Sequence, residues 1–120
     1  EDGRKQAQRI GEFFNKNKIE IGKVLSSEWC RCRETAKIAF KSYSTNSFLN
    51  SFYSSKFSKN KEKQIKAFNN YIKNLESKKN LILVTHYVFI SEVLNYAPSS
   101  GEIVVSDKNL NIIGSIEIDF

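Results

Sequence analysis

The stretch of sequence that decides the fold is Leu81-Ile82-Leu83-Val84-Thr85-His86. Its apolar residues follow one another without the polar alternation of a strand that has one wet face. A continuous apolar run of this length is typical of a strand covered on both faces, and such strands occur mostly in parallel sheets flanked by helices. The run therefore predicts an α/β domain, with His86 at the end of a buried strand.

The rest of the chain alternates as an α/β fold requires. Apolar residues at helical spacing predict helices over about 3–16, 31–40, 65–75 and 88–96. A second buried strand is predicted at Lys23-Val24-Leu25-Ser26, and the end of the chain predicts a hairpin of strands 102–106 and 112–120, the latter with one wet face. We expect three layers, a mostly parallel sheet between helices. Two strands before the hairpin are few for such a sheet, so it looks short by at least one strand.

A long polar segment, residues 42–60, separates the second predicted helix from the third. It is rich in Ser, Asn and Lys but also carries the apolar residues Phe48, Leu49, Phe52, Tyr53 and Phe57. A loop with this many aromatic residues is expected to fold back onto the core.

Composition limits the classes of function. A chain of 120 residues corresponds to a single domain, residues 1–120, and no apolar run reaches the roughly 20 residues that span a bilayer. The net charge of +6 favours anionic partners in general. Because no aromatic platform or finger motif accompanies the lysines of residues 56–66, we interpret them as a solvated face and expect no nucleic-acid partner.

The two cysteines, Cys30 and Cys32, are separated by one residue. Paired zinc ligands usually have two residues between them and need further Cys or His, so we expect no metal site. A disulfide across one residue would be strained. Two separate small thiols on different sides of a helix are the simplest interpretation.

Polar and basic residues follow the two predicted parallel strands. Ser26 and Ser27 end the first strand, where they fit turn and cap positions, Arg31 lies near the start of the next helix, and His86 ends the second strand. Ligands of open α/β sheets bind beyond the carboxyl ends of the strands, and both an arginine fork and a helix N-terminus favour anions. These residues predict a phosphate pocket, although a strand-end histidine also fits a structural role, and spacing alone leaves the two open.

Three segments carry a resemblance to a known family. They are Leu25-Ser26-Ser27-Glu28-Trp29-Cys30-Arg31-Cys32-Arg33-Glu34-Thr35-Ala36, Val84-Thr85-His86 and Asp2-Gly3-Arg4-Lys5-Gln6-Ala7. In order and type they resemble motifs of the histidine phosphatase superfamily, which has the phosphoglycerate-mutase-like fold. Cys30, Cys32 and the segment 100–105 further resemble a bacterial branch of small, often exported members. The resemblance thus implies an exported or periplasmic parent, whereas the residues themselves leave the compartment unknown.

The resemblance implies a phosphoryl-transfer site without metal or other cofactor. Arg31 would bind phosphate oxygens and hold the charge of the transition state, His86 would donate to the same oxygens, and the amide of Tyr87 would add a donor. Arg31 and His86 are the implied catalytic residues. The implied partner is a phosphorylated small molecule or a phosphoprotein.

The chain departs from the family in two places. It has no Arg-His-Gly motif, which in the family supplies the nucleophilic histidine, because its single histidine already matches the second motif. We expect that motif and the first strand to lie N-terminal to Glu1, so that this chain alone is inactive. Ser51 stands where many members carry the acid that protonates the leaving group.

One alternative function stays open. It is that of a non-catalytic module of the same fold that binds a phosphorylated ligand or a protein. A separate question is how the chain assembles. A sheet that lacks a strand leaves backbone groups unpaired, so we expect the chain either to form a homodimer through the exposed sheet edge or to be marginally stable.

Overall fold

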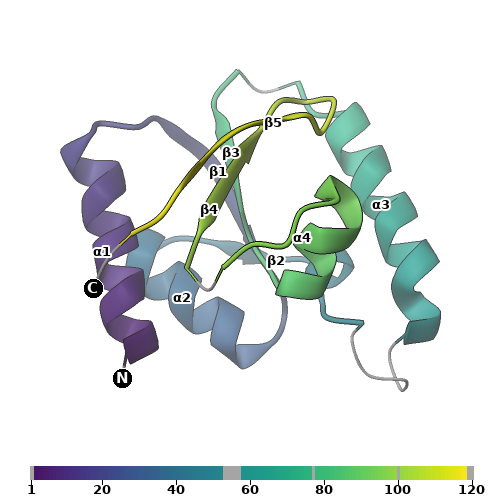
Figure 1. Cartoon of the computed structure of the whole chain (residues 1–120), viewed down its shortest axis with the longest axis horizontal. Helices are drawn as coiled ribbons and strands as arrows, with labels where there is room; N and C mark the ends of the chain where they lie inside the picture. The colour runs from purple at the N-terminus through teal and green to yellow at the C-terminus, as the bar shows by residue number, and fades with distance from the viewer. Residues whose placement is uncertain (1, 53–57, 77, 100, 119–120) are drawn as a thin grey trace.

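Three strands form a sheet at the centre of the molecule (Figure 1). The computed structural model describes residues 2–52, 58–76, 78–99 and 101–118, so the predictions that concern Tyr53, Phe57, Ser100 and Phe120 lie outside the described residues. The strands are β1 (Ile21–Ser26), β2 (Ser44–Thr45) and β3 (Asn80–Val84), in the order β2-β1-β3. Both pairings are parallel, which confirms the predicted α/β class.

Helices cover the sheet on both sides. In Figure 1, α1 (Asp2–Lys16) and α2 (Cys30–Phe40) lie to one side of it and α3 (Lys61–Lys73) lies to the other. The α1 and α2 helices approach closely at Gly11, whose missing side chain leaves room for the carbonyl of Ala39. The last helix, α4 (Tyr87–Leu94), follows β3 directly. The four α-helices of the described residues overlap the segments that helical spacing predicts, although α3 begins earlier, at Lys61, and α3 and α4 end two residues before the predicted ends.

The long polar segment folds onto the core, as its aromatic residues predict. It contains β2 and two short 3₁₀ helices, η1 (Ser47–Leu49) and η2 (Ser58–Asn60). Phe48, Leu49 and Phe52 are buried in a cluster that also contains Leu25, Phe68 and Phe89. Sequence patterns miss β2, because two exposed polar residues carry no hydrophobic period and join the sheet through backbone hydrogen bonds alone.

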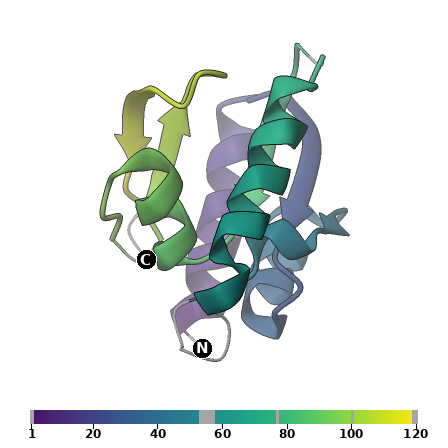
Figure 2. The ribbon, with the colours of Figure 1, turned by 90° about the vertical axis from the view of Figure 1, so that its right-hand side faces the viewer.

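A separate two-stranded sheet follows α4. The strands β4 (Ile103–Ser106) and β5 (Ile112–Ile116) pair antiparallel, as predicted, and Asp107 closes their turn by accepting from the backbone N–H groups of Asn109 and Asn111. Figure 2 shows this hairpin beside the three-stranded sheet and not within it. The expected dry face of β5 is not covered, since Ile112 is 40% exposed, Gly114 is exposed and Ile116 is only half-buried.

The apolar strand β3 lies at an edge of its sheet. It pairs with β1 and with no other strand of the described residues. The side chains from Leu81 to Val84 are therefore only half-buried, which corrects the expectation that this run is covered on both faces. Within the described residues, none of the helices combines the length and apolar character needed to cross a membrane.

Candidate functional site

The carboxyl ends of β1 and β3 lie side by side and bring Ser27 and His86 together. Ser26 is in register with Val84, and the N–H of Ser27 donates to the carbonyl of Val84 over 2.9 Å. Just beyond the ends of these two strands, the Nε2 atom of His86 lies 2.9 Å from the hydroxyl of Ser27. Parallel pairing thus places the ends of two segments that are 59 residues apart in one site.

The hydroxyl of Ser27, itself buried, is the centre of a hydrogen-bond network that extends to the exposed Glu28. It donates to Oδ1 of Asn50 over 3.0 Å and accepts from the N–H of Trp29 over 3.1 Å. Asn50 in turn bonds twice to Glu28: its Oδ1 accepts from the backbone N–H over 2.8 Å, and its Nδ2 donates to the carboxylate over 2.9 Å. The loop after η1 is therefore tied to the turn between β1 and α2.

Three further hydrogen bonds, two from Gln64 and one from Thr85, hold that loop in place. The side chain of Gln64, on α3, donates to the carbonyl of Asn50 over 2.7 Å and to that of Phe48 over 3.2 Å. At the end of β3, the hydroxyl of Thr85 donates to the carbonyl of Leu49 over 2.6 Å. Helix, loop and strand end thus hold Asn50 in place relative to His86.

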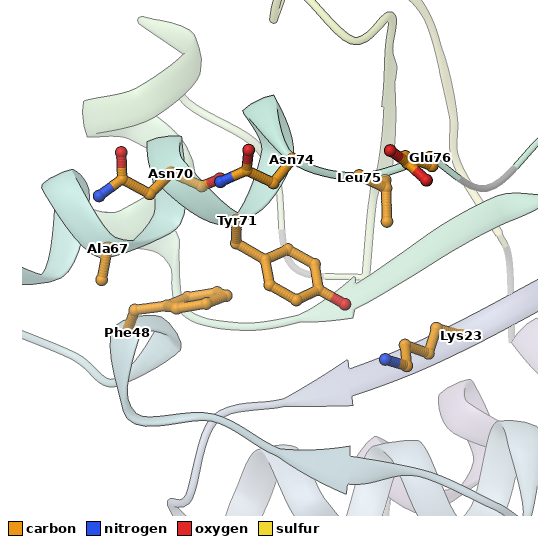
Figure 3. Close-up of a pocket in the computed structure, with 8 residues that line it drawn as sticks. All are labelled: Lys23, Phe48, Ala67, Asn70, Tyr71, Asn74, Leu75 and Glu76. Atoms are coloured by element: carbon orange, nitrogen blue, oxygen red, sulfur yellow. The ribbon is translucent and has the colours of Figure 1, made fainter.

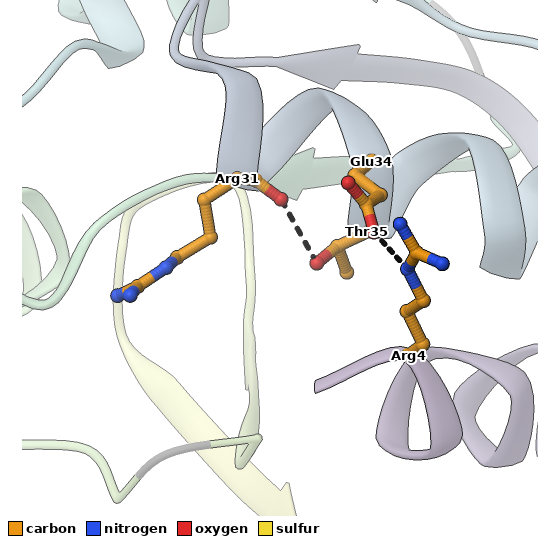
Figure 4. Close-up of polar contacts among 4 residues, drawn as sticks. All are labelled: Arg4, Arg31, Glu34 and Thr35. Carbon is orange, nitrogen blue, oxygen red and sulfur yellow. Dashed lines mark hydrogen bonds and ion pairs between the residues drawn. The ribbon is translucent and has the colours of Figure 1, made fainter. Parts of the chain in front are cut away.

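Arg31 provides the positive charge of the site. It lies in the first turn of α2 with its side chain exposed, and Figure 4 shows it extending away from the neighbouring ion pair of Arg4 and Glu34. Its backbone carbonyl accepts from the hydroxyl of Thr35. Because Arg31 has no ion-pair partner among the described residues, its charge remains available to an anionic ligand.

Burial and the charge of Arg31 both lower the pKa of His86. Loss of hydration disfavours the imidazolium and is the larger effect, and the charge of Arg31 adds to it, so the pKa of His86 lies below its usual 6.5. The imidazole is therefore neutral at pH 7. Burial also raises the pKa of the Cys32 thiol, although Ser27 and Arg31 partly oppose this, so Cys32 is not a ready thiolate.

Cys32 lies against the imidazole ring. Its Sγ is 3.6 Å from Nε2 and 4.0 Å from Nδ1 of His86. Cys30, two positions earlier, is exposed while Cys32 is buried, so the two thiols do occupy different sides of α2. Among the described residues, no group of three or more His, Cys, Asp or Glu side chains is placed to hold a metal ion.

Two helix N-termini point to the same end of the sheet. The residues that precede the first turns are Trp29 for α2 and His86 for α4; neither caps its helix with a side chain, and neither first turn contains an acidic residue. Neither N-terminus therefore has a capping side chain or a first-turn carboxylate to offset its amide dipoles, although Glu28 directly precedes Trp29, and such termini favour an anion. Two aromatic rings border this end: Trp29, 40% exposed and in edge contact with His86 at 4.9 Å between centroids, and Tyr87, 56% exposed.

The structure brings together most of the residues that the sequence singles out. Arg31, His86 and Tyr87 lie at one end of the sheet. Ser51 is buried, and its neighbour Asn50 makes the contact with Ser27. Sequence reasoning misses Asn50 and Gln64, because single amides in polar segments carry no pattern that distinguishes them.

An open groove lies apart from this site. Its volume is about 480 Å³, and its walls are Lys23 of β1, Phe48, the second half of α3 and the residues 74–76 that follow it (Figure 3). None of Arg31, Ser27 and His86 lines it. The chemistry-bearing side chains and this groove thus occupy different parts of the molecule.

Comparisons with known proteins show the fold and no more. The sequence matches no family profile, and no curated protein matches it. Among solved structures, the protein of open reading frame Rv3214 from Mycobacterium tuberculosis is similar, with a TM-score of 0.53 at 14% sequence identity. The superposition covers 78% of this chain and 65% of that protein, so the match spans slightly less than two thirds of the neighbour.

Proposed function

We propose that this chain is a phosphate-handling domain of the histidine phosphatase type. Its ligand would be the phosphoryl group of a small phosphomonoester or of a phosphoprotein. The observation that carries the proposal is the meeting of Arg31, His86 and two uncapped helix N-termini beyond the carboxyl ends of β1 and β3. Ligands of open α/β sheets bind at this end.

The roles follow from charge and hydrogen bonding. Arg31 supplies the full positive charge and a planar fork of donors that matches phosphate oxygens. In the site without a ligand, His86 is neutral because its pKa is lowered. Its role would be to orient the phosphoryl group, and the positive charge would come from Arg31. The N–H of Tyr87, in the first turn of α4, is a further donor.

The proposed fold is the phosphoglycerate-mutase-like one, with a further strand beside β3. Its support is that β3 has a strand partner on one side only and that the hairpin stands next to it as a separate sheet. The family mechanism uses two histidines, and these 120 residues contain one. Turnover therefore requires a histidine from outside these residues, and the chain by itself is proposed to bind without reacting.

The first experiment is a titration with inorganic phosphate, followed by the imidazole NMR signals of His86 and by the emission of Trp29. A bound anion favours the imidazolium, so phosphate should raise the pKa of His86. Arg31→Ala should weaken binding roughly 10-fold or more, since hydrogen bonds to charged groups are worth about 1.5–3 kcal/mol. Arg33→Ala, which removes an exposed arginine from the same helix, is the matched control and should retain most of the affinity. Equal losses in both variants would reduce the proposal to non-specific attraction.

The second experiment separates binding from catalysis. We expect no turnover of a simple aryl phosphate by the 120-residue chain. Robust hydrolysis that disappears in His86→Ala would contradict the two-histidine scheme. Phosphate binding that persists without turnover, even when an Arg-His-Gly segment is supplied in front of the chain, would favour the non-catalytic module of the same fold.

A further inference from the structure

The hydroxyl of Ser27 is fully buried and has three nitrogen and oxygen neighbours, besides a weaker contact with the Cys32 thiol. They are Oδ1 of Asn50 at 3.0 Å, Nε2 of His86 at 2.9 Å and the N–H of Trp29 at 3.1 Å. A hydroxyl donates one hydrogen bond and accepts two. Three neighbours therefore use its whole capacity, and only one of them receives its hydrogen.

The orientation of the Asn50 amide decides which one. The Glu28 carboxylate can only accept and the Glu28 N–H can only donate. The Asn50 Nδ2 lies 2.9 Å from that carboxylate and the Oδ1 lies 2.8 Å from that N–H, so the amide cannot be turned round without breaking both bonds. Its Oδ1 therefore faces Ser27 as an acceptor.

The hydrogen of Ser27 consequently goes to Asn50. If Ser27 donated to His86 instead, two oxygen acceptors would meet at 3.0 Å without a hydrogen between them, in a site where unpaired polar atoms cost about 1–3 kcal/mol. The Ser27 oxygen accepts one hydrogen bond from the N–H of Trp29. Its second acceptor position therefore faces Nε2 of His86. That nitrogen must carry a hydrogen.

We propose that Asn50 is a positioning residue that acts through Ser27 to hold neutral His86 as its Nε2–H tautomer, with Nδ1 unprotonated until the ring takes up a second proton. The contact with Cys32 does not compete. The thiol is a weak hydrogen-bonding group, and its sulfur lies 3.6 Å from Nε2 and 4.0 Å from Nδ1, farther than the 2.9 Å between Nε2 and the hydroxyl of Ser27. The proposal does not depend on what the ligand is.

The experiment uses the fact that His86 is the only histidine. With ¹⁵N-labelled histidine, one pair of imidazole signals reports the tautomer of this residue alone. At a pH where His86 is neutral, the wild-type chain should show the Nε2–H form with slow exchange of that proton with water. In Asn50→Leu, which removes the acceptor at similar size, Ser27 is free to donate to the ring. We expect exchange of the Nε2–H proton to become roughly 10-fold faster, as for the loss of one hydrogen bond, and the Nδ1–H form to appear.

Three variants show whether Asn50 acts through Ser27 or only supports the loop. Asn50→Asp keeps an oxygen acceptor and should preserve the wild-type tautomer. Asn46→Ala removes another amide of this loop, one that accepts from the N–H of Phe48, and should not change the imidazole signals. Ser27→Ala should reproduce the effect of Asn50→Leu, and the double variant should add nothing to it.

Two results would overturn the proposal: an Nδ1–H form in the wild-type chain, or an unchanged tautomer and exchange rate in Asn50→Leu. Should Asn50→Leu fail to fold, Ser27→Ala decides in its place. It removes the acceptor itself, so an undisturbed, slowly exchanging Nε2–H there would equally overturn the assignment.

Discussion

At the scale of single residues, His86 couples stability to pH. Burial and the charge of Arg31 hold its pKa below 6.5 in the folded chain, whereas the unfolded chain has the ordinary value. Between these two pKa values the unfolded state binds more protons, so stability falls as the pH falls from about 6.5 through the folded pKa. No such loss arises from His86 above pH 6.5.

The measurement is the urea midpoint of unfolding across pH 5 to 8 for the wild-type chain and for His86→Gln. The wild-type midpoint should decline below about pH 6.5, and the decline should flatten in the variant, since the carboxylates titrate mostly lower. Identical slopes in the two chains would show that the imidazole is not the group responsible.

The two thiols should differ in reactivity. Cys30 is exposed, whereas Cys32 is 5% exposed and burial raises its pKa. Because the thiolate is the reactive form, we expect a maleimide or iodoacetamide to modify one thiol in the native chain and two in denaturant. Cys30→Ser should then take up no reagent until unfolded. Native labelling of Cys32 in that variant would mean that the wall of the site beside His86 opens readily.

At the scale of elements, the packing of α1 on α2 depends on Gly11. A side chain there would place its Cβ 2.5 Å from the carbonyl oxygen of Ala39. Overpacking of this kind costs about 1–3 kcal/mol, against about 1 kcal/mol gained from alanine's higher helix propensity, so Gly11→Ala should destabilise the fold. Gly3→Ala, in the same helix but with nothing within 4 Å, is the matched control and should be neutral or stabilising by up to about 1 kcal/mol. Urea unfolding of both variants checks the pair, and equal stabilities would refute the close approach of the helices.

The sequence predicts those helices and strands that bury apolar side chains at a regular spacing, and it misses those that do not. The helices and the longer strands bury apolar residues at a regular period, and Ile65, Phe68 and Ile72 of α3 are of this kind. The strand β2 has no such period, since two polar residues join the sheet by backbone alone. The same distinction applies to the site: strand ends locate His86 and Ser27, whereas Asn50 reaches them through a loop whose course depends on long-range contacts with Gln64 and Thr85.

At the scale of the whole molecule, the uncovered side of β3 is the feature that most affects behaviour in solution. The strand is apolar, its side chains are half-buried, and the backbone groups on the side away from β1 have no strand partner among the described residues. Unpaired edges of this kind readily pair with another chain. Two copies related by a two-fold axis would bring β3 of one against β3 of the other, antiparallel, and satisfy both edges.

We therefore expect the 120-residue chain to associate through β3, or else to be of marginal stability as a monomer. Sedimentation velocity over a range of concentrations should show a mass rising from 13.8 kDa toward twice that value. Hydrogen exchange locates the contact: amides of β3 should become more protected as concentration rises, whereas those of β5, which lies in the separate hairpin, should not. Protection that rises in β5 alone would place the contact on the exposed Ile112 and Ile113. A monodisperse monomer with a high melting temperature would contradict both expectations, association and marginal stability. It would mean that the outer edge of β3 requires no partner strand.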